Sequence, residues 1–474
     1  MSYKHGIYSD LIPSSISITS GSNIPVYVGT APVHRLSEWS EYLNKPLLIS
    51  GLEDAYKKLG YNPNDDFEEF TLSGVVYAHF SNSINPIGPI VVINVLDPDK
   101  HKATEETTKS LILINGIGAL EDDVILDSIE IDGKTAGTHY KVSYSGDGKA
   151  LVESIGNGLT SPVQVSYIKI DASKVVATDI IGTYNQNEDT LTGLKCIDTL
   201  YEELNVIPAI LSAPGFNHIQ EVEKALTSSC TKIGGRWEAI CVTDIDPEEE
   251  TIDKAIAWKE DKGYVSIRNK VCWPKGRMGT RDMFMSILTI VRMMQTDYIG
   301  AGVPYETPSN KQIDIVSTIA SDKMIRINLT NGNKLNEKGI TTAIYNGGKY
   351  VLWGPHMANF KYGTSIKVED MFDSNIRMNL YLLNDFQLRN TDIVDTPMSR
   401  NDVDALIHTE QSKLNALVAD GKLLYGKFNF LAKNNTNEDI MSGDFTFDTA
   451  VTNTPPGKSL TNRIQYTSQG IDTL

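Results

Sequence analysis

The feature that most constrains this chain is an alternation of strand-like and helix-like segments that is interrupted in the sequence and then resumes. Its first part lies in residues 23–106 and includes a continuous apolar run at residues 90–96. Such a run is typical of a strand covered on both faces. The alternation resumes in residues 179–350. Together the two parts predict one split α/β core domain, with a largely parallel sheet and helices packed on it.

Several segments of this core have a clear periodicity. Residues 24–28 alternate between apolar and other side chains, and residues 52–59 are helix-like. Strands are expected at residues 209–212 and 239–243, with a helix between them. Thr280 is expected to cap a further helix. The apolar positions of that helix are Met283, Ile287, Ile290, Val291 and Met294.

Residues 107–178, between the two parts of the core, have a different character. They contain short β-prone runs at residues 128–131, 140–144 and 163–170. Turn residues such as those of the Asp132-Gly133 pair separate the runs. This stretch therefore predicts an all-β domain inserted into the core.

Residues 351–457 predict an α+β domain that follows the core. A helix is expected to begin at Ser399, with Asp402 in its first turn, and to end at Gly421. Its apolar positions share one face and are Val403, Leu406, Ile407, Leu414 and Leu417. Strand-like stretches follow this helix.

Both ends of the chain are predicted to be arms that need a partner. Residues 1–22 are poor in large apolar side chains and contain one short alternation, and residues 458–474 contain a final strand of edge type. An edge strand can be paired by another chain. We expect seven residues to build a sheet shared between copies: Ile16, Ile18, Phe445, Phe447, Leu460, Ile464 and Tyr466.

The charge and the apolar content exclude several classes of function. The formal net charge of -17 and the pI near 5.0 oppose binding to phosphate backbones, which depends largely on Lys and Arg. No apolar run approaches the roughly 18 residues that cross a bilayer. Residues 1–14 lack the basic and apolar segments of a secretory signal. We therefore expect no direct nucleic-acid partner, no membrane partner, and synthesis that ends in the cytoplasm.

Fragments that imitate catalytic motifs fail on spacing. Gly457-Lys458-Ser459 resembles the end of a phosphate-binding loop, but Thr452 stands where that motif needs glycine. Gly363-Thr364-Ser365 resembles the nucleophile segment of subtilisin-type proteases, and His139 lies in a fragment distantly like their histidine segment. A triad also needs an aspartate that orients the imidazole, and the chain has no matching segment. We expect no catalytic residue and no bound cofactor.

Metal binding is not expected either. The carboxylates near Asp244 and Asp246 lack the glycine of a calcium loop, so a solvated loop is the expected structure. The cysteines at positions 196, 230, 241 and 272 form no CxxC pair, and the eight histidines show no zinc-site spacing. Buried free thiols are therefore predicted.

The chain resembles the phage tail sheath family, in its branch with a subtilisin-like domain. The likeness extends in order from about residue 24 to the end, and it lies mainly in the second half. The segments that carry it are residues 139–144, 163–167, 207–215 (IPAILSAPG), 304–310 (PYETPSN), 335–342 (LNEKGITT), 353–354, 395–398 and 414–417.

This resemblance implies a subtilisin-like sheet in the core, a β-sandwich in the insertion and no enzymatic activity. It implies a helical polymer of hexameric discs around a tail tube, linked by arms that donate strands to neighbouring copies. The implied partners are further copies of the chain, the tail tube protein, and the baseplate and tail terminator proteins. The implied location is the virion, after assembly in the host cytoplasm. Arg400, Asp404 and Lys413 are candidates for a helix face toward the tube.

Two alternatives remain open at this point. One is the sheath of a tailocin or of another contractile injection system, which the sequence does not distinguish from a phage sheath. The other is a hydrolase that uses the subtilisin-like core, with Ser365 as the residue to test.

Overall fold

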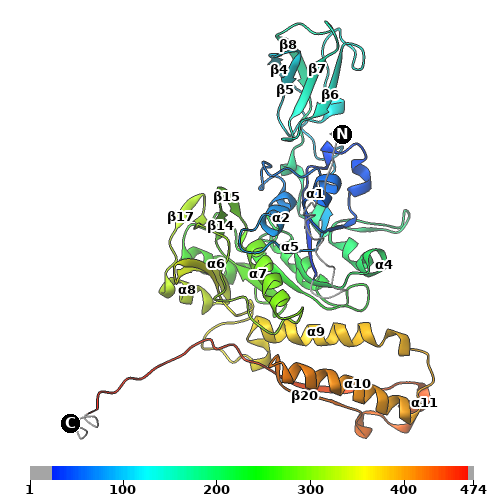
Figure 1. The fold of residues 1–474 in the computed structure, drawn as a ribbon, viewed down its shortest axis with the longest axis vertical. Coiled ribbons are helices and arrows are strands. Elements are labelled where there is room, and N and C mark those ends of the chain that lie inside the picture. The colour runs from blue at the N-terminus through cyan, green and yellow to red at the C-terminus, as the bar shows by residue number, and fades with distance from the viewer. Residues whose placement is uncertain (1–23, 468–474) are drawn as a thin grey trace, which may run out of the picture. The chain divides into compact units, whose positions relative to one another are not determined.

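The computed structural model describes residues 24–467, which form two compact units (Figure 1). The larger, here called the core unit, extends to Pro304 and continues over Pro308–Asp395. The smaller, here called the C-terminal unit, comprises Tyr305–Thr307 and the chain from Thr396 onward. The expected N-terminal arm, with Ile16 and Ile18, lies outside the described residues.

An eight-stranded sheet forms the middle of the core unit, in the order β19-β18-β13-β12-β11-β1-β3-β2. The six inner strands are parallel to one another, and the two edge strands are antiparallel to their neighbours. The strands are β1 (Ile24–Gly29), β2 (Pro46–Ile49), β3 (Ile90–Asn94), β11 (Pro208–Ser212), β12 (Ile240–Asp244), β13 (Asn269–Cys272), β18 (Ile340–Asn346) and β19 (Lys349–Trp353). The expected α/β fold with a largely parallel sheet is thus confirmed.

Helices cover both faces of this sheet (Figure 1), which explains why β1, β3, β12 and β13 are buried along their whole length. In β1, Tyr27 joins the hydrophobic cluster on one face, whereas Val26 and Val28 join the cluster on the other. Helices contributing to the first cluster are α1 (Leu52–Leu59), α2 (Thr71–Phe80), α7 (Met285–Ile299) and α9 (Asp373–Arg389). Helices contributing to the second are α3 (Ala177–Ile181), α4 (Leu200–Leu204) and α5 (Gln220–Ser229). A third cluster includes residues of α6 (Ile252–Lys262) and α8 (Leu329–Asn336).

All four cysteines belong to these layers. Each is free and buried, which confirms the sequence expectation. Burial raises the pKa of the Cys196 and Cys272 thiols to about 12, so both are protonated at neutral pH.

The prediction that Thr280 caps a helix is wrong. Thr280 lies in the turn between β14 (Lys275–Met278) and β15 (Arg281–Met283). Gly279, beside it, has a φ of +60°, a conformation suited to a tight reversal. These strands form a small antiparallel sheet with β16 (Ser317–Ala320) and β17 (Lys323–Ile325). The helix α7 begins only at Met285.

The β-rich stretch contains two small antiparallel sheets around a hydrophobic cluster of their own. The strands are β4 (Thr107–Leu111), β5 (Ile117–Ala119), β6 (Tyr140–Tyr144), β7 (Ala150–Ser154) and β8 (Val163–Tyr167), and a short hairpin of β9 (Tyr184–Asn185) and β10 (Thr190–Leu191) follows. The run at residues 128–131 differs from expectation, because Glu130 makes only an isolated bridge to Ser166. Ile129 and Ile131 are nevertheless buried, as their alternation indicated.

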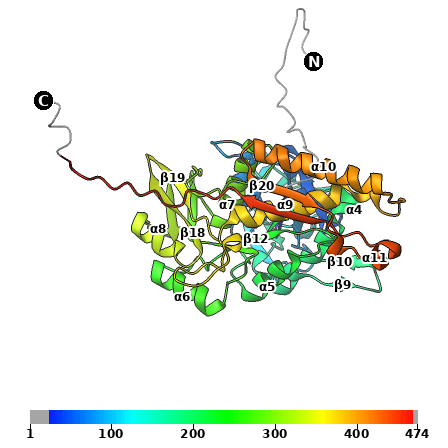
Figure 2. The same ribbon diagram turned by 90° about the horizontal axis from the view of Figure 1, so that it is seen from below.

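The C-terminal unit consists of α10 (Arg400–Ala419), β20 (Leu423–Asn429), α11 (Asn437–Ser442) and β21 (Asp448–Asn453) (Figure 2). The predicted helix is confirmed: Ser399 and Asp402 form a reciprocal cap at its start. Gly421, just beyond its end, has a φ of +73°. Helix α10 packs along β20.

Helix α9 was not singled out from the sequence. Its first turns bury polar residues, including Asp373, Asn375 and Arg377, between apolar ones such as Ile376 and Met378. Buried polar side chains interrupt the apolar stripe by which an amphipathic helix is recognised.

Candidate assembly surface

The last described residues, 454–467, leave the C-terminal unit without joining a sheet (Figures 1 and 2). Among the residues described, no strand follows Asn453. Leu460, Ile464 and Tyr466 are 93%, 89% and 93% exposed. All three occupy even-numbered positions, so an extended chain projects them to one side. This segment, here called the C-terminal arm, has the side-chain pattern of a strand that lacks a sheet.

The start of the C-terminal arm is held in place. The hydroxyl of Thr454 donates a hydrogen bond of 2.9 Å to the carbonyl oxygen of Gly421, at the end of α10. Pro455 and Pro456 follow, and each fixes φ near -65° and has no N–H to donate. Consecutive prolines favour extended backbone. The C-terminal arm therefore leaves from a fixed point in an extended direction.

Phe445 and Phe447 have a different environment from the exposed residues of the C-terminal arm. The ring of Phe447 stacks on Phe428, with 5.3 Å between centroids, and lies 5.3 Å from the ring of Phe430. The ring of Phe445 lies 6.3 Å from that of Phe430. Both residues precede β21 and pack inside the C-terminal unit of their own chain. The structure thus places them beside the hairpin and not in an arm.

Strands β20 and β21 form a two-stranded antiparallel sheet, and a side chain of α10 occupies the outer edge of β20. The Nε2 group of Gln411 donates to the carbonyl oxygen of Gly426 at 3.0 Å. Its Oε1 atom accepts from the N–H of Phe428, also at 3.0 Å. One carboxamide thereby makes two bonds of the kind that a neighbouring strand would make.

Gly426 allows α10 to approach β20 this closely. A Cβ at this position would lie 2.9 Å from the Cβ of Leu414, too close for a native contact. Leu414 is one of the predicted apolar positions of the helix, and it is buried. The apolar face of α10 therefore brings Gln411 within hydrogen-bond distance of the strand.

The three residues expected on a tube-facing helix do not share one face of α10. Arg400 and Asp404 are exposed and 3.8 Å apart in the first turns. Lys413 follows Arg400 by thirteen positions, which at about 3.6 residues per turn places it on the opposite side. It is half-buried, and burial lowers its pKa to about 8. Only Arg400 and Asp404 therefore remain together as a surface pair.

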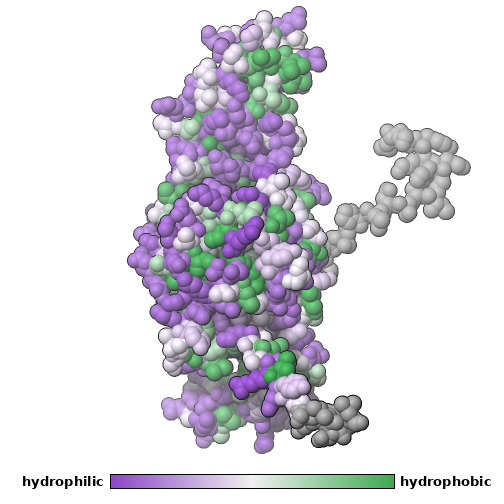
Figure 3. Space-filling model, turned by 90° about the vertical axis from the view of Figure 1, so that its left-hand side faces the viewer, coloured by the Kyte–Doolittle hydropathy of each residue, from purple (hydrophilic) through white to green (hydrophobic). Residues whose placement is uncertain are grey.

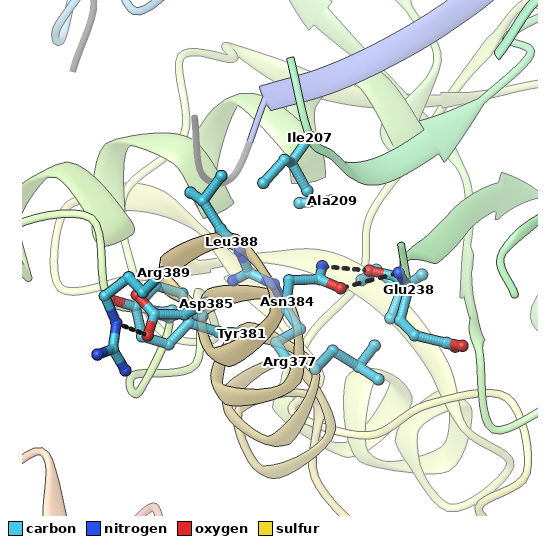
Figure 4. A pocket seen from close by; sticks show the side chains of 12 residues that line it. Ile207, Ala209, Glu238, Arg377, Tyr381, Asn384, Asp385, Leu388 and Arg389 are labelled. Atoms are coloured by element: carbon cyan, nitrogen blue, oxygen red, sulfur yellow. Dashed lines mark hydrogen bonds and ion pairs between the residues drawn. The ribbon is translucent and has the colours of Figure 1, made fainter. Parts of the chain in front are cut away.

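A pocket in the core unit is lined by polar side chains that bond to one another or to nearby backbone. It encloses about 300 Å³ beside α9, whose side chains Arg377, Tyr381 and Asn384 contribute to its wall (Figure 4). Asn384 Oδ1 accepts from the N–H of Glu238 at 2.9 Å, and its Nδ2 donates to the Glu238 carbonyl at 2.8 Å. Arg389 and Asp385 form an ion pair of 2.7 Å. The lining contains no serine, cysteine or histidine.

Asp244 corrects the expectation of a solvated loop. Its carboxylate is buried and accepts from the Ser286 N–H at 2.8 Å, the Ser286 hydroxyl at 2.5 Å and Asn217 Nδ2 at 3.1 Å. Burial raises the pKa of Asp244 to about 6, although these hydrogen bonds favour the charged form. The carboxylate serves the first turn of α7, whose N-cap residue Phe284 supplies no side-chain acceptor.

The remaining motif-like residues are not brought together. Ser365 is exposed, whereas His139 is half-buried and accepts from the Thr135 N–H at 2.9 Å through Nδ1. Lys458 and Ser459 lie in the exposed C-terminal arm. Between residues 24 and 467, no three His, Cys, Asp or Glu side chains are placed to hold a metal ion.

The surface and helices add two observations. On the face drawn in Figure 3, hydrophilic residues predominate and apolar residues form small groups. Within the described part of the chain, no helix is both long and apolar enough to cross a lipid bilayer.

Known proteins resemble this chain in both sequence and fold. No protein-family model matches the sequence. A tail sheath protein of Burkholderia phage BcepMu is 26% identical over 425 residues, covering 82% of this chain and 83% of the phage protein.

Similar folds occur in cryo-EM structures of two contractile assemblies. A chain of the anti-feeding prophage baseplate has a TM-score of 0.60 at 14% identity, covering 98% of this chain and 100% of that chain. A chain of the contracted sheath complex of the extracellular contractile injection system PVC has a TM-score of 0.58 at 11% identity, covering 99% of both. The contracted helical sheath of the anti-feeding prophage has a TM-score of 0.56 at 13% identity, covering 99% and 100%.

The fold is therefore that of subunits from contractile assemblies. The sequence match extends over most of the chain and is to a tail sheath protein. The chain is thus similar in sequence to a phage tail sheath protein and in fold to subunits of contractile assemblies.

Proposed function

We propose that this chain is the structural subunit of a contractile sheath, which polymerises from many copies and works by changing their packing. The observation that carries the proposal is the C-terminal arm, whose Leu460, Ile464 and Tyr466 are around nine-tenths exposed. A strand-like segment with this exposure is suited to pairing with another copy. The tail sheath relative supports the same function.

In this proposal, strand exchange links the copies. A donated segment adds to a sheet of its neighbour, where backbone hydrogen bonds provide adhesion and alternate side chains set the register. Each hydrogen bond contributes about 1 kcal/mol net, so a joint of a few bonds is weak alone and strong when repeated along a polymer. In this arrangement Phe445 and Phe447 support the receiving hairpin, and the C-terminal arm is the donor.

We further propose that hexameric discs of the subunit stack helically around a tail tube. Contraction is then a rigid-body rearrangement from an extended lattice to a shorter, wider one, with hinges in the arms. The driving energy is the additional surface buried between subunits in the second packing. This shortening drives the tube through the host envelope.

The proposed partners are further copies of the chain, the tube protein, the baseplate and the tail terminator, and the proposed location is the virion after assembly in the host cytoplasm. One of the similar folds belongs to a baseplate structure, which supports the baseplate as a partner. Arg400 and Asp404 are the proposed surface pair toward the tube. No nucleic-acid or membrane contact is part of this function.

Deletion of residues 458–474 tests the proposed function. The shortened protein is expected to fold and to remain monomeric, because it loses exposed residues and no described strand. The full chain, purified in parallel, is expected to form long hollow cylinders in negative-stain electron microscopy. Cylinders formed equally well by the shortened protein would contradict the proposal.

Two alternatives are separated by simple observations. A sheath of a tailocin or other injection device would assemble in the same way, and neighbouring capsid and terminase genes would instead indicate a virus. A hydrolase would label with a serine-directed fluorophosphonate. Stoichiometric labelling at Ser365 would favour that enzyme, whereas an unlabelled chain is expected.

A further inference from the structure

The two outer edges of the C-terminal sheet are not equivalent. On β20, the carbonyl of Gly426 and the N–H of Phe428 already bond to Gln411. In an antiparallel pair, the N–H and C=O groups of successive residues point alternately toward the partner strand and away from it. Gly426 and Phe428 therefore point away from β21, and Lys427, between them, points toward it.

The same alternation shows which backbone N–H and C=O groups of β21 point to its outer edge. Lys427 lies opposite Ala450, and Phe428 lies opposite Thr449. Because Lys427 and Ala450 face each other, the backbone groups of Thr449 and Val451 point to the outer edge of β21. Thr449 is exposed and Val451 is half-buried. That edge is open within the described sheet, which has two strands.

The charges indicate which segment fits this edge. Residues 423–453 contain Lys427 and Lys433 against Glu438, Asp439, Asp444 and Asp448, a net charge of -2. Residues 454–474 contain Lys458, Arg463 and Asp472, a net charge of +1 in a chain of net charge -17, and both cations lie in residues 454–467. Residues 1–22 contain Lys4 and Asp10, which balance. Opposite charges favour the C-terminal arm over the N-terminal segment as the occupant.

The arm that occupies the edge must come from a different copy. The two prolines at 455 and 456 follow β21 closely and favour extended backbone, which opposes a return onto the strand that the arm has just left. In the single chain, Leu460 and Ile464 of the arm are exposed. The arm of a neighbouring copy can reach this edge without reversing direction directly after its own β21.

We propose that the Gln411 carboxamide closes the β20 edge, so that the sheet accepts the C-terminal arm of another copy only on the β21 edge. Gln411 takes the hydrogen bonds that a strand would make with β20, so the donated arm can pair only with β21. This inference rests on the proposed function and adds to it the receiving edge and the residue that selects that edge.

Disulfide trapping in the full chain tests this inference. Ala450→Cys reports on the β21 edge, and Lys427→Cys, directly opposite it, is the matched reporter for the β20 edge. Each is combined with Asn462→Cys, Arg463→Cys or Ile464→Cys, so that both sides of the extended arm and alternative registers are covered. The four native cysteines are buried and leave the background low. A disulfide needs Cβ atoms roughly 3.5–4.5 Å apart, so it forms with the adjacent strand only.

Mild oxidation of the assembled protein is expected to give covalent ladders with Ala450→Cys on a non-reducing gel. The Lys427→Cys yield is expected to be roughly tenfold lower, because an arm on β20 must displace both hydrogen bonds of Gln411. Adding Gln411→Ala is expected to raise the Lys427→Cys yield, whereas Thr409→Ala, on the same helix and exposed, leaves it low.

The possible failures are distinguishable. Equal or greater trapping through Lys427→Cys with Gln411 intact would overturn the inference. Polymers that form without any Ala450→Cys trapping would also overturn it and leave the proposed function standing. Absence of polymers from the full chain would instead remove the proposed function itself.

Discussion

Lys270 and Asp373 form an ion pair of 2.8 Å whose two side chains are wholly inaccessible to solvent. Lys270 lies on β13, and Asp373 is the first residue of α9. The Lys270 ammonium group also donates to the carbonyl oxygens of Gly354 at 2.8 Å and His356 at 3.2 Å. All three of its N–H groups are thereby engaged. This contact fixes the start of α9 to the central sheet.

Removing one partner of this pair should strongly destabilise the core unit. Lys270→Met leaves the Asp373 carboxylate buried without its cation, and breaking a buried pair in this way costs about 3–5 kcal/mol. Urea unfolding followed by tryptophan fluorescence measures the loss. Lys57→Met, which removes an exposed pair with Glu53, is the control and should leave the midpoint unchanged. Equal midpoints for both variants would show that the buried pair is dispensable.

Asp244 should give the stability of the protein a pH dependence. Its pKa rises from an ordinary value of 3.8 to about 6 in the folded chain, because burial favours the neutral acid. Its stabilising contribution is therefore complete below pH 3.8 and is lost as the pH rises through about 6. The loss approaches about 3 kcal/mol at neutral pH, because a pKa difference of one corresponds to about 1.4 kcal/mol.

The comparison for this prediction is Asp244→Asn, which cannot ionise. The unfolding free energy of the wild type, relative to that of the variant, should fall as the pH is raised from 4 to 8. Other titrating groups cancel in this difference, because both proteins contain them. A difference independent of pH would mean that Asp244 stays ionised throughout.

Gly426 should be intolerant of a side chain. Gly426→Ala places a Cβ against Leu414, and overpacking of this kind costs about 1–3 kcal/mol. Hydrogen exchange followed by mass spectrometry should show faster exchange in residues 423–429, because α10 and Gln411 move away from β20. Gly457→Ala is the matched control, since a Cβ there meets no atom within 4 Å. Unchanged exchange in Gly426→Ala would exclude this packing.

Replacing Leu460, Ile464 and Tyr466 together with serine should separate folding from assembly. The three side chains are nearly fully exposed, so the free energy of unfolding should stay within about 0.5 kcal/mol of the wild type. Polymer formation should be lost, as judged by sedimentation and electron microscopy. Retained polymers would show that backbone pairing is sufficient, or that the arm is not the donor.

The sequence predicted best those elements whose signals are local. The helix α10 was recognisable because Ser399, Asp402 and Gly421 mark its ends and its apolar positions keep one period. Strand β3 was recognisable because a parallel strand covered on both faces is apolar throughout. Leu460, Ile464 and Tyr466 were singled out by alternation; they are exposed and form no strand in the single chain, and their role in assembly stays a prediction.

The misses depend on contacts between distant parts of the chain. Thr280 has the chemistry of a helix cap, but pairing of β14 with β15 makes it a turn residue. Asp244 was expected in solvent because its partners Asn217 and Ser286 are far away in sequence. The contact of Gln411 with β20 likewise depends on how closely α10 packs against the strand. The sequence alone does not show which distant residues come into contact.

If the proposed sheath acts outside the cell in which it was made, the burial of all four thiols has a consequence. Oxygen and extracellular oxidants cross-link proteins through accessible thiols. Subunits joined by such intersubunit disulfides could no longer move past one another. Because all four cysteine thiols are buried within the α/β layers, oxidation does not link the subunits by disulfides. The subunits therefore keep the freedom to rearrange that contraction requires.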